Sequence, residues 1–179
     1  VVDFLWLPFA LARYLTASGD LALLNEHPLA PDGGVASEDD VYLMCVHGLR
    51  GCLRFGARGL PPAAACLHDE APGRGESVRL GFFMTAVLGR FADVADRRGD
   101  FGFATTCRGA ALALKAQCEE HGWDGQWYRW AYLDSGNVLG ASANPACRVD
   151  LETQAWAVLA GAARGAEALR AASARLRDE

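Results

Sequence analysis

The spacing of hydrophobic residues predicts a chain of α-helices separated by short breaks. Apolar side chains recur at steps of three and four residues, the repeat that places them on one face of a helix. The predicted helices are residues 4–17, a short 21–26, about 41–55, about 77–97, about 103–121, one that begins at Asp150, and 166–177. Short connections favour antiparallel neighbours, so the predicted fold class is all-α, built of helical hairpins.

Start and stop signals support these boundaries. Gly19, Gly99 and Gly122 follow three of the predicted helices, and glycine is the residue that most often ends a helix. Asp20 is a candidate N-cap for the short helix. The acidic run 37–40 precedes the next helix, where negative charge favours a helix N-terminus.

Two stretches depart from the helical repeat. Residues 59–76 have prolines near their start and glycines near their end, which predicts an irregular loop. Residues 126–133 fit either a short strand or a helical turn, and the pattern leaves both open. No internal repeat of about 20–50 residues is visible, and 179 residues fit one domain.

Charge and composition exclude several classes of partner. The net charge is −5 and no long basic run is present, so nucleic acid is not expected as a partner. No apolar stretch reaches the roughly 18 residues of a membrane span, and no signal peptide is visible. We therefore expect no membrane contact from this segment itself.

The six cysteines show neither a C-x-x-C pair nor the spacing of a zinc site. No metal site is therefore predicted. Cys45 and Cys52 are seven positions apart, on one helical face. Buried free thiols are the favoured interpretation over disulfides, which suits a reducing compartment.

The stretch from His121 to Gly161 has the most distinctive chemistry. It opens with three Trp and two Tyr within residues 123–132, and a polar turn follows at residues 134–137. Aromatic faces beside amides and carboxylates are typical of sugar sites, because the rings cover apolar C–H patches while the polar groups bind hydroxyls. Packing between helices explains the same aromatic residues equally well.

Short motifs occur over nearly the whole chain. They are Asp3-Phe4-Leu5-Trp6-Leu7-Pro8, Ala12-Arg13-Tyr14 with Gly19-Asp20, Phe55-Gly56-Ala57 with Gly59-Leu60-Pro61, Gly75-Glu76-Ser77-Val78, His121-Gly122-Trp123-Asp124-Gly125 with Trp127-Tyr128-Arg129, and Cys147-Arg148-Val149-Asp150-Leu151 with Gln154-Ala155-Trp156. Because these motifs occur in this order, the chain resembles the catalytic region of glycoside hydrolase family 94. That family includes cellobiose- and chitobiose-type phosphorylases and the C-terminal region of cyclic β-1,2-glucan synthases.

The resemblance implies an (α/α)6 barrel with the sugar site at one end. The roughly six predicted helices would form about half of such a barrel. We therefore expect residues 1–179 to be a single fragment of the domain, truncated at both ends, whose partner is the remainder of the parent polypeptide. For the synthase branch, the resemblance implies a cytoplasmic domain of a larger inner-membrane synthase.

The family reaction is inverting phosphorolysis of a β-glucoside, or its reverse. One carboxylic acid of the protein protonates the glycosidic oxygen while inorganic phosphate attacks the anomeric carbon from the opposite face, in place of the water of an inverting hydrolase. The acid must be protonated near neutral pH, so it needs a raised pKa. The implied ligands are a β-glucan or glucose disaccharide and phosphate as co-substrate, with no other cofactor.

One motif departs from the family pattern. Between Gly-Leu-Pro and Gly-Glu-Ser the family carries Gly-Asp-Trp-Asn-Asp-Gly with the general acid, whereas this chain has a shorter segment without the Trp-Asn pair. Asp69 is the nearest substitute for the acid, followed by Glu70. Either could instead be a solvated loop carboxylate. The segment would then have lost catalysis, leaving a glucan-binding or bracing module.

The resemblance also implies binding roles for five further residues. Asp3 matches an acidic residue at the family's sugar subsite, although it could simply cap a helix. Trp6 and Trp127 are candidate sugar-binding residues, with packing in the core as the favoured alternative. Gln154 matches a phosphate-site glutamine, with a surface amide as the alternative, and Arg148 could bind phosphate or pair with a neighbouring carboxylate.

Overall fold

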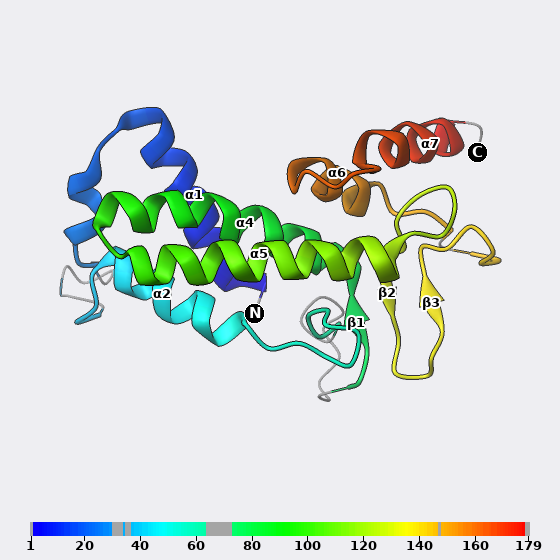
Figure 1. Ribbon diagram of the computed structural model, residues 1–179, viewed down its shortest axis with the longest axis horizontal. Coiled ribbons are helices and arrows are strands. Elements are labelled where there is room, and N and C mark those ends of the chain that lie inside the picture. The colour runs from blue at the N-terminus through cyan, green and yellow to red at the C-terminus, as the bar shows by residue number, and fades with distance from the viewer. Residues whose placement is uncertain (1, 30–33, 35–36, 64–72, 147, 178–179) are drawn as a thin grey trace. The chain divides into compact units, whose positions relative to one another are not determined.

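The computed structural model describes residues 2–29, 34, 37–63, 73–146 and 148–177, without the side chains of Val2 and Asp3. Helices dominate it (Figure 1). They are α1 (Val2–Ser18), the 3-10 helix η1 (Leu21–Asn25), α2 (Val41–Cys52), α4 (Val78–Arg98), α5 (Phe101–Gly122), α6 (Leu151–Leu159) and α7 (Gly165–Arg177). Every predicted helix is present among the described residues, so the predicted all-α class is confirmed.

The chain divides into two compact units. Unit 1 contains Val1–Leu53 and Val87–Arg108, and unit 2 contains Arg54–Ala86 and Gly109–Glu179. Helices α4 and α5 therefore contribute residues to both. They form an antiparallel hairpin (Figure 1), because Arg108 near the start of α5 bonds Asp93 near the end of α4, while Cys118 near the end of α5 lies against Val78 at the start of α4.

Unit 1 is built around one apolar face of α2. Tyr42, Cys45, Val46 and Leu49 on this face are buried, and Asp40 caps the helix by accepting from the Leu43 amide at 2.7 Å. The helix ends at Cys52 rather than near residue 55 as predicted. The next residue, Leu53, has φ −76° and ψ 55°, which is not a helical conformation, so the helix ends earlier than the apolar pattern suggests.

Unit 2 combines the start of α4, the end of α5 and the C-terminal helices. A Cβ added to Gly81 of α4 would lie 2.5 Å from Cys118 Sγ of α5, so the close approach of these helices requires a residue without a side chain. Trp156 of α6 packs on Phe83 of α4 with ring centroids 4.3 Å apart. Trp156 is therefore a core residue, one of the two roles considered for the aromatic residues.

A small antiparallel sheet lies in unit 2, and the helical pattern did not reveal it. Its strands are β1 (Glu76–Ser77), β2 (Ala131–Tyr132) and β3 (Val138–Leu139), in the order β1-β2-β3. Glu76 pairs with Tyr132, and Tyr132 pairs with Val138. Of the two structures left open for residues 126–133, a short strand or a helical turn, the strand is observed, at Ala131–Tyr132. Two-residue strands are too short to show the alternation that identifies a strand in sequence.

The cysteines lead to a testable prediction. Cys45, Cys52, Cys107 and Cys118 are buried free thiols, as predicted, while Cys66 and Cys147 lie outside the described residues. Burial raises the pKa of Cys45 to about 12 and that of Cys107 to about 11. Because the thiolate is the reactive form, we expect these four thiols to resist iodoacetamide at pH 8 in the native protein and to react after unfolding. Peptide mass spectrometry measures each site separately, and rapid native alkylation of Cys45 would contradict the burial.

Candidate functional site

Trp127 is a bracing residue of the aromatic stretch in unit 2. Its side chain is buried, and its indole Nε1 donates to the carbonyls of Gly140 and Arg148, each at 3.0 Å. These contacts join the turn after β3 to the segment that precedes α6. The ring predicted to bind sugar therefore lies in the interior, and its single N–H donor is used within the protein.

Gln154 of α6 is the most completely bonded of the predicted site residues. Its side chain is fully buried, and Oε1 accepts from the Tyr128 amide at 2.9 Å. Nε2 donates to the Tyr128 carbonyl at 2.8 Å and to the Asp150 carbonyl at 2.9 Å. Both amide protons are thus committed to backbone carbonyls. A phosphate ligand at this residue would need one of these bonds to open.

Arg148 differs from Gln154 because its side chain is exposed. Its Nε donates to the Asn144 carbonyl at 2.7 Å. The neighbouring Asp150 caps α6 by accepting from the Thr153 amide at 3.0 Å, and Arg79 approaches its carboxylate at 3.9 Å. The structure therefore places three predicted residues, Trp127, Arg148 and Gln154, around the N-terminus of α6, with the guanidinium facing outward.

The remaining predicted sugar-binding residues belong to α1 in unit 1. Trp6 is 47% exposed and meets Phe9 edge to face, with ring centroids 5.8 Å apart. Asp3 lies within the first turn of α1, whereas an N-cap would precede the helix, and its side chain is outside the described atoms. Trp6 is thus partly exposed, unlike the buried Trp127.

The predicted catalytic residues Asp69 and Glu70 lie outside the described residues, but both flanks of their segment are described. Ala63 donates its backbone N–H to the Gly75 carbonyl at 2.8 Å, and Pro62 forms an isolated β-bridge with Glu76. The described residues on either side of this segment, Ala63 and Gly75, therefore lie next to each other beside β1.

An ion pair between the buried Glu76 and the partly exposed Arg58 stabilises this position, and sequence reasoning did not assign it a role. The Glu76 side chain is 1% exposed, and its carboxylate accepts from Arg58 Nη1 at 2.9 Å and from the backbone amides of Arg58 and Leu60 at 2.8 and 3.3 Å. The Arg58 guanidinium also lies 4.1 Å from the Tyr132 ring centroid. A Cβ at Gly56 would lie 2.6 Å from the Glu76 carboxylate, which explains that glycine. The Gly-Glu-Ser motif was visible in the sequence, but its partners were not.

This ion pair gives a stability prediction. We expect Glu76→Gln to lower the free energy of unfolding by about 2 kcal/mol, because the buried backbone amides lose a charged acceptor. Arg58 is 39% exposed and can turn into water, which keeps the cost below that of stranding a buried charge. Urea unfolding measures the change. The exposed Glu167→Gln on α7 is the control, and equal losses in the two variants would contradict the assignment.

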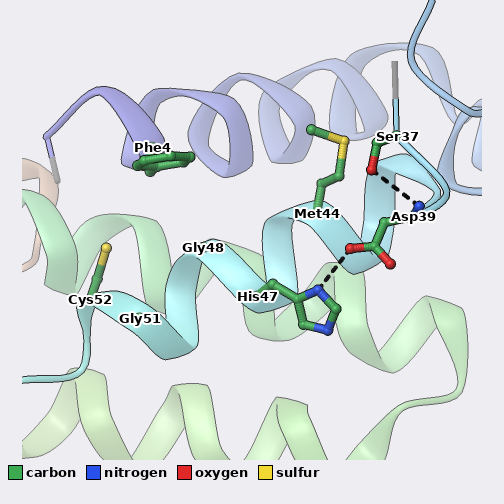
Figure 2. Close-up of a pocket in the computed structure, with 8 residues that line it drawn as sticks. All are labelled: Phe4, Ser37, Asp39, Met44, His47, Gly48, Gly51 and Cys52. Carbon is green, nitrogen blue, oxygen red and sulfur yellow. Dashed lines mark hydrogen bonds and ion pairs between the residues drawn. The ribbon is translucent and has the colours of Figure 1, made fainter. Parts of the chain in front are cut away.

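Unit 1 contains a separate pocket that sequence analysis did not identify. Its volume is about 520 Å³, and Figure 2 shows the residues that line it. They are Phe4 of α1, Ser37 and Asp39 before α2, and Met44, His47, Gly48, Gly51 and Cys52 of α2. His47 Nδ1 and Asp39 Oδ2 lie 2.8 Å apart. No short motif joins residues 4, 39 and 47, so only the folded chain brings them together.

The described residues contain neither a candidate metal site nor a candidate membrane span. Within the described ranges, no three His, Cys, Asp or Glu side chains gather in a way that could hold a metal ion. Likewise, none of the described helices combines the length and the apolar character needed to cross a membrane.

Comparison with known proteins explains the order of the motifs. Residues 1–176 match the catalytic domain of the glycosyl hydrolase 94 superfamily. The chain is 32% identical to the cyclic beta-(1,2)-glucan synthase NdvB of Rhizobium meliloti, over 96% of this chain and 7% of that protein. It is 30% identical to the cellobionic acid phosphorylase of Neurospora crassa, over 88% of this chain and 20% of the relative. It is 29% identical to the N,N'-diacetylchitobiose phosphorylase of Vibrio proteolyticus, over 97% of this chain and 22% of the relative.

These relatives are all much longer than the chain, which spans less than a quarter of each. The family match nevertheless covers nearly every residue, including the motifs around Glu76, Trp127 and Gln154. The chain therefore belongs to the glycosyl hydrolase 94 superfamily, as part of its catalytic domain.

Proposed function

We propose that this chain is part of an enzyme that synthesises or phosphorolyses β-linked glucans, with a β-glucan or glucose disaccharide and inorganic phosphate as ligands. The observation that carries the proposal is the family match over residues 1–176. The relatives, a cyclic glucan synthase and two phosphorylases, support the substrate class. Phosphate is proposed as the co-substrate because phosphorolysis consumes it.

We further propose that residues 1–179 form one portion of a longer (α/α)6 catalytic domain. The antiparallel α4–α5 hairpin is the expected building block of such a barrel. Two large side chains on α1, Leu7 and Tyr14, are more than 40% exposed. Exposed apolar side chains on a helix are expected where another part of a protein covers that face.

The predicted residues have different proposed roles in this reaction. Asp69, or else Glu70, donates the proton to the glycosidic oxygen as that bond breaks. Phosphate attacks the anomeric carbon from the opposite face, so a β-glucoside yields an α-glucosyl phosphate. Arg148, whose guanidinium is exposed near α6, is the better-placed phosphate ligand of the predicted pair, because Gln154 is bonded internally. Asp3 and Trp6 are proposed to contact sugar.

The complete parent protein tests the reaction directly. Incubation with the β-1,2-linked disaccharide sophorose and inorganic phosphate is expected to release glucose and α-glucose 1-phosphate in equal amounts. The reverse reaction, from glucose and α-glucose 1-phosphate, is expected to release phosphate. Omitting phosphate is the control. Sugar release that does not depend on phosphate would show that the reaction is hydrolysis and not phosphorolysis.

A second candidate function is a glucan-binding or bracing module without turnover. Two observations favour it: the Trp-Asn pair of the family's acid motif is absent, and Trp127 and Gln154 use their polar atoms on backbone partners. Saturable binding of sophorose without phosphate release or uptake would support this module. Turnover at ordinary enzyme rates would exclude it.

A further inference from the structure

The pocket of unit 1 has two contrasting sides. Figure 2 shows Phe4 on α1 and Met44 extending from α2, while Asp39 and His47 form a polar edge. The Phe4 side chain is 68% exposed, although a phenyl ring is normally buried. The pocket volume of about 520 Å³ falls within the range of small-ligand sites.

Two glycines leave the α2 side of the pocket open. Gly48 and Gly51 lie on adjacent positions of one helical face, and a Cβ at Gly48 would make ordinary contact with Phe4 Cδ1 at 3.8 Å. A Cβ at Gly51 would meet nothing within 4 Å. Gly48 lies in the interior of α2, where glycine is disfavoured, so helix stability does not explain it. Their effect is to leave room beside the exposed ring.

The polar edge offers both donors and acceptors. Ser37 Oγ accepts the Asp39 amide at 3.1 Å, which leaves its hydroxyl proton to donate elsewhere. Asp39 Oδ2 bonds His47 Nδ1, which leaves Asp39 Oδ1 as an acceptor and His47 Nε2 as a second polar atom. Sugar hydroxyls both donate and accept, so they can use all three groups.

We propose that this pocket binds one uncharged glucosyl unit of an oligosaccharide, with an apolar sugar face on Phe4 and hydroxyls on Ser37, Asp39 and His47. A stacked C–H face and bonded hydroxyls are how aromatic and polar groups share a sugar. No Arg or Lys is among the described lining residues, and the Asp39 carboxylate repels anions, so phosphate and sugar phosphates are disfavoured. The inference rests on the proposed function and adds a sugar site in unit 1.

Methionine methyl groups give a direct test on the full chain. The sequence has two methionines: Met44 lines the pocket, and Met84 is fully buried in unit 2. In protein labelled with ¹³C at these methyl groups, titration with sophorose is expected to shift the Met44 signal saturably and to leave Met84 unchanged. Binding at another site, which moves Met84 or neither signal, would overturn the pocket assignment.

A variant that fills the pocket keeps the test independent of misfolding. Gly51→Leu places a side chain in open space and improves helix propensity, so the fold is preserved. We expect it to weaken the Met44 titration at least about tenfold, equivalent to about 1.4 kcal/mol. Gly89→Leu on α4 is the matched control, because its Cβ also meets nothing within 4 Å and it does not line the pocket. Equal sophorose affinity in Gly51→Leu and wild type would overturn the inference.

Two further readouts separate this inference from the proposed function. α-Glucose 1-phosphate is expected to shift Met44 less than sophorose at equal concentration, and the reverse order would overturn the choice of an uncharged ligand. Phosphorolysis by the parent protein with an unresponsive Met44 would overturn the pocket and leave the proposed function standing. A saturable Met44 shift without phosphorolysis would support the pocket and favour the binding module.

Discussion

Replacing Gln154 with methionine is expected to lower the free energy of unfolding by about 4 kcal/mol, because the buried amide and carbonyl of Tyr128 both lose a partner at about 1–3 kcal/mol each. The glutamine is fully buried and joins Tyr128 to α6 through bonds of 2.8 and 2.9 Å. The methionine side chain is about as long as that of glutamine but has no amide group. The loss in the free energy of unfolding therefore comes mainly from the lost hydrogen bonds and not from a cavity. Urea unfolding followed by circular dichroism measures the change.

Gln126→Met is the matched control, since Gln126 is exposed on the same stretch of chain. Its effect is expected to stay within about 0.5 kcal/mol. A Gln154→Met variant as stable as wild type would contradict the bracing role. In the complete parent, phosphate use tests the other role: if Gln154 binds phosphate, the variant weakens phosphate use more than glucan binding, and equal phosphate affinity removes it from the site.

The starts of three helices were predictable because they depend on neighbouring residues. Asp20, Asp40 and Asp150 each accept from a backbone amide two or three positions later, at 3.1, 2.7 and 3.0 Å. Such N-caps are visible in sequence, since the donor and acceptor are almost adjacent. The long apolar faces of α4 and α5 likewise need no knowledge of distant segments.

The environment of Glu76 could not be predicted in this way. Its partners Arg58 and Leu60 are 18 and 16 positions away, and its strand partner Tyr132 follows much later in the chain. The motif indicated that a glutamate matters there, but burial and pairing appeared only in the fold. The His47–Asp39 contact is similar, because an isolated histidine carries no ligand spacing in sequence.

The sequence named the candidate site residues, but not the contacts that their side chains make. Family motifs identified Trp127, Arg148 and Gln154, and the structure places all three around the start of α6. What their side chains bond could not be read from motifs, because a glutamine amide binds a backbone carbonyl or a phosphate with the same two protons. The two roles can be distinguished only in the folded chain, which brings Gln154 next to Tyr128 although they are 26 positions apart in the sequence.

Asp69→Asn in the complete parent is expected to reduce kcat/KM for β-glucosides by at least about 10²-fold. General acid catalysis typically contributes about 10²–10⁴-fold, and asparagine cannot donate the proton that a glucose leaving group needs. The loss should be smaller for a nitrophenyl β-glucoside, because nitrophenolate leaves without protonation. This difference between substrates identifies an acid catalyst, since a general folding defect would lower both rates alike.

Glu70→Gln is the control next to it, and it is expected to change both rates little if Asp69 is the donor. A reversed pattern would assign the proton to Glu70, and equal losses in both variants would show that neither residue alone is the donor. The segment lacks the family's Trp-Asn pair, so the wild-type rate is itself informative. A parent that binds sophorose without detectable phosphorolysis would show that shortening the loop removed the acid. In that case the chain would serve as a glucan-binding module, and neither variant would change sugar affinity.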